Sequence, residues 1–206
     1  MEMTDAMAHS NAKADFFDEL AQGWEERNYP PAVRERLTPL AAAFPLAPGM
    51  TVLDLGCGEG VLIPYIRERV GEFGRLIELD PSEAMLRGAA RKDNGRPWLL
   101  KAAAESIPLP SSLVDTVIAF ACFPHFDDPA MALAEAFRVT KPGGRIVVAH
   151  LLNREELRRH HAAHFQVEND VLPDHDNMRA LFEAAGWTGI SITEAPGLYY
   201  LEANKP

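Results

Sequence analysis

The feature that most constrains this chain is a short apolar strand that runs directly into a glycine-rich turn. Residues 52–60 read Val-Leu-Asp-Leu-Gly-Cys-Gly-Glu-Gly, and a helical pattern follows over residues 61–70. Gly56, Gly58 and Gly60 carry no Cβ atom that would hold a ligand away from the backbone, and glycine adopts the positive φ angles of a tight strand-to-helix turn. The segment therefore predicts a βα unit that binds a nucleotide-sized ligand.

The turn does not match the common phosphate-binding motifs. The dinucleotide fingerprint G-x-G-x-x-G would need a glycine where the chain has Val61, and the Gly-Lys-Ser/Thr of the phosphate-binding loop is absent. Asp54 precedes the turn and Glu59 lies inside it, whereas no Lys or Arg occurs between Thr51 and Ile66. These acids favour a ligand with a cationic centre.

A second predicted strand ends in an acid at a spacing typical of ribose binding. Residues 75–80 read Arg-Leu-Ile-Glu-Leu-Asp, so that Asp80 follows the first glycine of the turn. In doubly wound folds an acid roughly 20 residues beyond that glycine hydrogen-bonds ribose hydroxyls. Ser82 is placed to cap the next helix, and Met85 is expected to face inward.

These two segments resemble the class I S-adenosylmethionine-dependent methyltransferases. Motif I of that family is an acid, a residue and G-x-G-x-G, and its D-x-S-x-x-M-L segment matches Asp80-Pro81-Ser82-Glu83-Ala84-Met85-Leu86. Three further segments match the family in the same order along the chain. Residues 103–110 resemble the D-A-x-x-L-P-F loop, residues 113–120 resemble the S-F-D-x-V strand, and residues 137–148 resemble the R-V-L-K-P-G-G turn. The resemblance covers residues 50 to about 150 and is nearest to the ubiquinone and menaquinone methyltransferase branch.

The resemblance implies S-adenosylmethionine as the cofactor. The residues that would hold it are Asp54, Gly56, Cys57, Gly58, Gly60, Asp80, Pro81, Met85, Ala104, Glu105 and Phe120. The chain departs from the family at Ala103, where an aspartate commonly accepts from the adenine amino group. That contact would have to come from backbone, water or Glu105.

The alternation of strand and helix patterns predicts an α/β fold in one domain over residues 1–206. We expect a Rossmann-like, doubly wound, seven-stranded sheet, mostly parallel, with helices on both faces and a C-terminal antiparallel hairpin at residues 188–194 and 198–202. Residues 1–46 would form a helical cap, 47–150 the cofactor-binding core, and 151–206 the substrate-side helices and hairpin. In the cap, residues 15–27 and 31–44 carry apolar side chains at helical spacing.

Composition and charge limit the classes of partner that the chain is expected to bind. A chain of 206 residues with 47% hydrophobic and 24% charged residues can bury one core. The formal charge of −10 disfavours nucleic acid, and the apolar stretch 107–126 is broken by prolines and Asp115, so no membrane span is expected. The polar N-terminus lacks a signal peptide pattern, and two cysteines suit a reducing compartment. We therefore expect a cytoplasmic monomer or homodimer.

Six of the 7 histidines follow residue 120 and gather near predicted strand ends. They could be ordinary surface and capping residues. They could instead supply a general base, with His125 as the first choice and His150 and His161 next. We expect no metal, although His160 and His164 have i,i+4 spacing, and the weaker metal hypothesis would use His125, His150, His160, His161, His164 and Asp170.

The sequence thus predicts methyl transfer from S-adenosylmethionine to a small, neutral or anionic acceptor. Two alternatives remain, namely a non-catalytic or regulatory S-adenosylmethionine-binding protein and a methyltransferase that acts on protein or RNA. The Asn/Asp-Pro-Pro-Tyr/Phe motif of amino-group methylation is absent after the fourth strand, where residues 120–126 read Phe-Ala-Cys-Phe-Pro-His-Phe. This argues against nucleobases and glutamine amides as acceptors.

Overall fold

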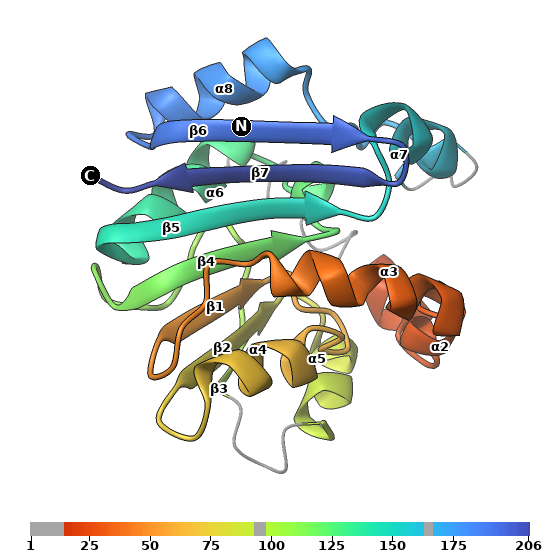
Figure 1. Cartoon of the computed structure of the whole chain (residues 1–206). Helices are drawn as coiled ribbons and strands as arrows, with labels where there is room; N and C mark the ends of the chain where they lie inside the picture. The colour runs from red at the N-terminus through yellow and green to blue at the C-terminus, as the bar shows by residue number, and fades with distance from the viewer. Residues whose placement is uncertain (1–14, 93–97, 163–166) are drawn as a thin grey trace, which may run out of the picture.

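A seven-stranded sheet with helices on both faces organises the chain (Figure 1). The structure, a computed structural model, describes residues 15–92, 98–162 and 167–206. Its strands are β1 (Thr51–Leu55), β2 (Arg75–Asp80), β3 (Trp98–Lys101), β4 (Val114–Phe120), β5 (Thr140–His150), β6 (Thr188–Ala195) and β7 (Leu198–Asn204). Its helices are α2 (Trp24–Asn28), α3 (Pro31–Ala42), α4 (Ile63–Val70), α5 (Glu83–Ala90), η1 (Phe123–His125), α6 (Pro129–Val139), α7 (Arg154–His161) and α8 (His175–Ala184), and residues 15–20 are also helical.

The strand order places a crevice at the carboxyl ends of the central strands. The order is β3-β2-β1-β4-β5-β7-β6, and β1 pairs in parallel with both β2 and β4. The chain therefore winds outward in both directions from β1 and β4, and ligands of such sheets bind outside the carboxyl ends of the strands at this switch point. Figure 1 shows α2 and α7 at that end of the sheet.

Two apolar layers bury the two faces of the sheet. One layer packs α3, α4 and α5 against residues such as Val52 and Leu76, and the other packs α6, α7 and α8 against residues such as Leu53 and Ile77. Neighbouring residues of one strand thus point to opposite layers, as the period of two requires. The central strand β1 is buried along its whole length, which explains its nearly continuous apolar sequence.

The structure confirms the predicted fold class and most of its elements. The strand at 75–80 has the predicted bounds, and the Ser82 side chain accepts from the Met85 backbone N–H as the cap of α5. The C-terminal strands form the predicted antiparallel hairpin, with β7 rather than β6 paired to β5. Among the described residues, no helix has the length and apolar character that crossing a bilayer requires.

One predicted helix is interrupted. The apolar spacing over residues 15–27 predicts a continuous helix, but a turn separates residues 15–20 from α2. Gly23 precedes α2 with φ 69° and ψ 22°, a left-handed conformation that ends regular helix geometry and that glycine adopts without a Cβ clash. The bend changes the direction of the segment over the carboxyl ends of the strands.

Candidate functional site

The glycine-rich turn brings backbone from three strands together. Gly56 has φ 72°, and its N–H donates to the carbonyl of Leu79 at the end of β2 (2.8 Å). A Cβ atom on Gly56 would lie 2.6 Å from the Cβ of Cys122, which follows β4. Only glycine therefore permits the loops after β1 and β4 to meet this closely, and the approach occurs at the switch point of the sheet.

Two buried acids flank the turn. Asp80 accepts from the backbone N–H groups of Gly58 and Ser82, each at 2.9 Å, and ties the turn to the start of α5. Burial raises the pKa of Asp80 to about 6. Asp54 is buried on β1, and burial, reinforced by the charge of Asp80, raises the pKa of its carboxyl group. The Oδ2 atom of Asp54 has no hydrogen-bond partner among the described residues, so it can accept from a ligand.

A cavity of about 670 Å³, called here the main cavity, opens beside this turn. It is lined by ten of the eleven residues expected to hold the cofactor, namely Asp54, Gly56, Cys57, Gly58, Asp80, Pro81, Met85, Ala104, Glu105 and Phe120. Gly60 does not line it. A Cβ atom there would lie 2.4 Å from Ile63 Cδ1 and 3.1 Å from Ala89 Cβ, so Gly60 instead permits the turn to pack against α4 and α5.

The N-terminal segment forms a roof over the main cavity. Phe16, Phe17 and Trp24 of this segment line the cavity. The carboxylate of Asp18 accepts from the Ala84 backbone N–H (3.0 Å), and the Glu25 N–H donates to Glu59 in the glycine-rich turn (2.8 Å). The sequence did not reveal these two contacts, which fasten the roof to both cofactor segments.

The histidines after β4 and on α7 meet in the main cavity. His125 Nδ1 lies 2.7 Å from Asp170 Oδ2, and its ring centroid lies 5.0 Å from that of His161 and 5.4 Å from that of Phe17. His161 Nδ1 donates to the backbone carbonyl of Asp170. Asp170 therefore orients both rings, a role that the sequence did not indicate because Asp170 entered only the metal hypothesis.

The structure corrects the interpretation of His161 as a solvated surface residue. The side chain is 5% exposed, and burial lowers its pKa. The reason is the packing of α7 across the end of the sheet, which turns His161 inward beside Leu157, while His160 on the same helix is exposed and still borders the main cavity. Helical spacing alone cannot distinguish these two neighbours.

His150 at the end of β5 is the most deeply buried of these three candidate bases. It is 2% exposed, it lines the main cavity, and its Nε2 has no hydrogen-bond partner in the described part of the chain. Burial, with smaller effects from His125 and His161, lowers its pKa to about 3. His150 therefore stays neutral at physiological pH and can donate or accept one hydrogen bond.

The neutral state of His150 predicts a pH-dependent stability. An unfolded histidine takes up a proton as the pH falls through about 6.5, whereas buried His150 resists protonation down to a pH of about 3. The unfolded state then binds more protons, so wild-type stability should fall by about 2 kcal/mol more than that of His150→Gln between about pH 7.5 and about pH 5. Urea unfolding of both proteins measures this difference. Equal losses would mean that His150 titrates normally in the folded state.

The metal hypothesis finds no assembled ligand set in the described chain. Within residues 15–92, 98–162 and 167–206, no three His, Cys, Asp or Glu side chains are placed to hold a metal ion. His164, which the hypothesis requires for its i,i+4 pair, lies outside the described residues.

The remaining polar groups near the main cavity have structural contacts. Cys122 Sγ donates to the Leu55 carbonyl (2.9 Å), and burial raises the thiol pKa of both Cys57 and Cys122, so neither is an activated nucleophile. Glu105 Oε1 accepts from the backbone N–H groups of Asp127 and Asp128, 2.9 and 3.2 Å away, and holds the loop before α6.

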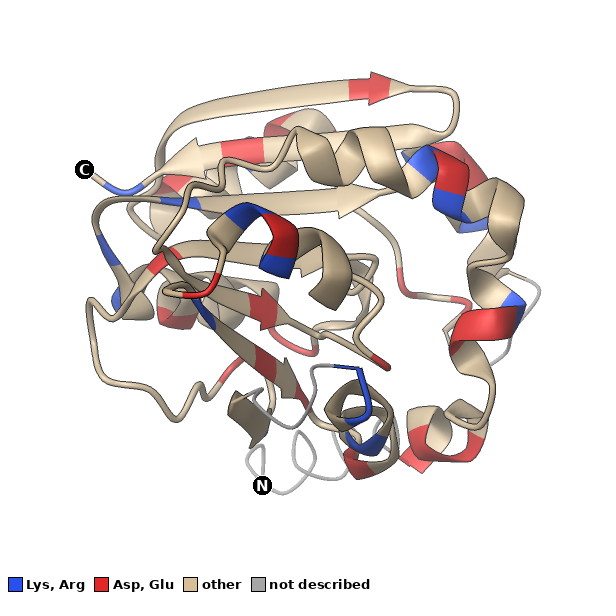
Figure 2. Cartoon of the chain, turned by 60° about the horizontal axis from the view of Figure 1, so that its bottom comes forward, with Lys and Arg blue, Asp and Glu red and all other residues tan. Residues whose placement is uncertain are grey.

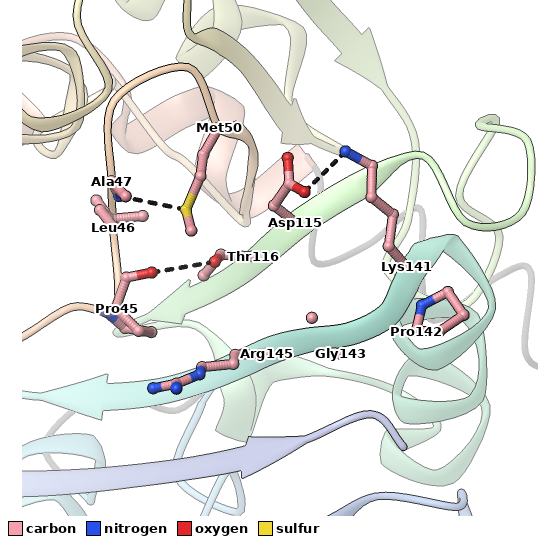
Figure 3. Close-up of a pocket in the computed structure, with 11 residues that line it drawn as sticks. Pro45, Leu46, Ala47, Met50, Asp115, Thr116, Lys141, Pro142, Gly143 and Arg145 are labelled. Carbon is pink, nitrogen blue, oxygen red and sulfur yellow. Dashed lines mark hydrogen bonds and ion pairs between the residues drawn. The ribbon is translucent and has the colours of Figure 1, made fainter.

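A second cavity, of about 370 Å³, lies at the opposite end of the sheet, where β4 and β5 begin (Figure 3). Asp115 pairs with Lys141 at 2.7 Å, and Thr116 Oγ1 donates to the Pro45 carbonyl. Among the described residues that line it there is no histidine or cysteine. Asp115 neutralises Lys141, and Arg145 pairs with Glu202 at 2.7 Å, whereas the candidate histidines lie at the other end of the strands.

Comparisons with known proteins agree with this geometry. A family described as a methyltransferase domain matches residues 53–148. Over 106 residues the chain is 38% identical to the ubiquinone/menaquinone biosynthesis C-methyltransferase UbiE of Vibrio campbellii, an alignment that covers 49% of this chain and 41% of that protein. The matched region thus spans about two fifths of that relative.

Solved structures share the fold over nearly the whole chain. A putative methyltransferase of Haloferax volcanii, solved in complex with the Trm112 methyltransferase activator, has a TM-score of 0.74 at 24% identity and covers 92% of this chain and 97% of its own. A SAM-dependent methyltransferase from Aquifex aeolicus has a TM-score of 0.67 at 24% identity, with 94% and 98% covered. At this identity the likeness establishes the fold.

Proposed function

We propose that this chain, whose residues 53–148 match a methyltransferase domain family, is a class I, S-adenosylmethionine-dependent methyltransferase that methylates a small-molecule acceptor bound beside the cofactor in the main cavity. The observation that carries the proposal is that His125, which pairs with Asp170, borders the same cavity as the glycine-rich turn and Asp80. When bound, the cofactor supplies an electrophilic methyl group on a sulfonium.

The residues around the turn suit this cofactor. The glycines allow the backbone to approach it, and Asp80 would accept from ribose hydroxyls. The Oδ2 of Asp54, for which the described residues offer no hydrogen-bond partner, would accept from its cationic amino group. The aromatic roof would exclude water from the reacting groups and favour their alignment.

His125 would take the proton of the acceptor. Asp170 accepts the proton on Nδ1, which selects the tautomer in which Nε2 is the basic nitrogen, and it stabilises the imidazolium that forms. His150, neutral and directed to the same cavity, would hydrogen-bond the acceptor and hold it in line with the methyl group.

Cavity size and charge favour a small acceptor. About 670 Å³ is the scale of a small-molecule site, and part of it would hold the cofactor. Figure 2 shows Lys and Arg positions dispersed among Asp and Glu positions of the described chain rather than gathered in a basic stripe. Such a surface, with a net charge of −10, does not favour RNA.

Methyl-labelled S-adenosylmethionine tests the proposal. Purified protein is incubated with the labelled cofactor and, separately, with a metabolite extract, a protein fraction and an RNA fraction. We expect label in the metabolite fraction only, and less of it with His125→Ala. Label confined to protein or RNA would replace the small-molecule acceptor by a macromolecule. Cofactor binding with no transfer to any fraction would indicate a regulatory or scaffolding role.

A further inference from the structure

Glu78 is a buried acid for which the proposed reaction has no use. It lies in the middle of β2 and is 0% exposed. In the parallel pairing of β1 with β2 it stands opposite Asp54, so the two buried side chains lie next to each other on one face of the sheet. Burying a second carboxyl group against the first is costly unless the pair is stabilised, which calls for an explanation.

The groups that interact with the pair are one further carboxyl group, two thiols and a phenol. In addition to burial, the charge of Glu78 raises the pKa of Cys57 in the turn after β1, and the charge of Asp80 at the end of β2 raises the pKa of Asp54. Besides burial, the charge of Asp54 also contributes to the raised pKa values of Cys122, which follows β4, and of Tyr29, which follows α2. The charge of Asp80 opposes a second negative charge on the pair, and none of the other groups named here is a cation that would offset it.

One proton resolves the conflict. Two carboxyl groups in contact cannot both ionise in a buried site without strong repulsion, whereas a carboxylic acid can donate to a neighbouring carboxylate and satisfy both. The same hydrogen bond fixes the rotation of the carboxylate that receives it. Asp54 also lines the main cavity, and its Oδ2 has no hydrogen-bond partner among the described residues.

We propose that Asp54 and Glu78 share one proton and carry a single negative charge, and that Glu78 is a positioning residue which holds Asp54 toward the cofactor. The shared proton depends only on the contact between the two acids. The positioning role rests on the proposed function, because it concerns the cofactor site. Glu78 thus acts through its donated hydrogen bond and not as a second anion.

Infrared spectroscopy tests the shared proton without any ligand. A protonated carboxyl group has a carbonyl stretch separate from the bands of ionised carboxylates, so the difference between wild type and Glu78→Gln at neutral pH should contain one carboxylic acid band. Glu135→Gln is the control, since it removes a carboxylate of α6 that pairs with Arg138 at 2.6 Å and should leave that band in place. Absence of the band from the wild type would overturn the proposal.

The affinity for S-adenosylhomocysteine, measured by calorimetry, tests the positioning role. Gln and Leu are both neutral and close to Glu in size, but only Gln can donate to Asp54. Glu78→Gln should bind within about threefold of wild type, and Glu78→Leu should bind about tenfold more weakly or worse. Thermal unfolding verifies that both variants fold.

The outcomes separate the possibilities. Equal affinities for the Gln and Leu variants would overturn the positioning role, whether both match wild type or both are weakened. A folded wild type that does not bind S-adenosylhomocysteine would refute the proposed function and, with it, the positioning role. The infrared band would still decide whether the two acids share a proton.

Discussion

The His125→Ala variant is expected to transfer methyl groups about 10²- to 10⁴-fold more slowly than wild type while binding S-adenosylmethionine with nearly unchanged affinity. A general base acts on the acceptor proton in the transition state, and it makes no contribution to ground-state binding of the cofactor. Initial rates with the acceptor identified by the labelling experiment, together with calorimetric cofactor affinity, measure the two effects separately.

Two variants control this result. Asp170→Asn keeps a side chain of similar shape beside His125 but removes the negative charge 2.7 Å from Nδ1, so it should also slow turnover, by less than loss of the base. His175→Ala removes a histidine that pairs with Glu194 at 2.6 Å and does not line the main cavity, so its rate should stay near that of wild type.

An unimpaired His125→Ala enzyme would contradict the assignment of the base. The metal hypothesis would then have a direct test, because a chelator should abolish activity and added Zn²⁺, Mn²⁺ or Fe²⁺ should restore it. If elemental analysis finds no metal in the purified protein, and the chelator leaves its activity unchanged, that hypothesis is excluded as well.

Asp80→Ala is expected to weaken S-adenosylmethionine binding by about 1.5 to 3 kcal/mol, the usual loss when charge-assisted hydrogen bonds are removed. In this structure Asp80 also receives the N–H groups of Gly58 and Ser82, so the substitution loosens both segments that would contact the cofactor. Calorimetry on wild type and variant gives the difference directly.

Asp80→Asn is the matched comparison, because it retains one acceptor oxygen and loses the charge. Its affinity should lie between those of wild type and Asp80→Ala. Equal affinity in wild type and Asp80→Ala, or a preference of the wild type for a nicotinamide dinucleotide, would show that the cofactor assignment is wrong.

Local sequence was sufficient for the cofactor side of the molecule. The turn with Gly56 and Gly58 and the strand end at Asp80 depend on backbone conformation and on strand-to-helix order, both of which are encoded by neighbouring residues. Gly60 shows the limit of this reasoning, since its lack of a Cβ serves packing against Ile63 and Ala89 and not the cavity wall. Gly23 is a similar case. Apolar spacing alone predicted one continuous helix over residues 15–27, whereas the left-handed backbone of Gly23 interrupts it.

The acceptor side was decided by tertiary structure. His125 and Asp170 are 45 positions apart, and Glu78 meets Asp54 only because β1 and β2 pair in one register. His161 becomes a cavity residue through the packing of α7, although its exposed neighbour His160 has the same side chain. The sequence by itself determined the fold class and the conformation of the glycine-rich turn, because those rest on contiguous segments. Strand register and helix packing decided which carboxyl and imidazole groups lie next to each other and which of them are buried. Local sequence spacing does not encode register or packing.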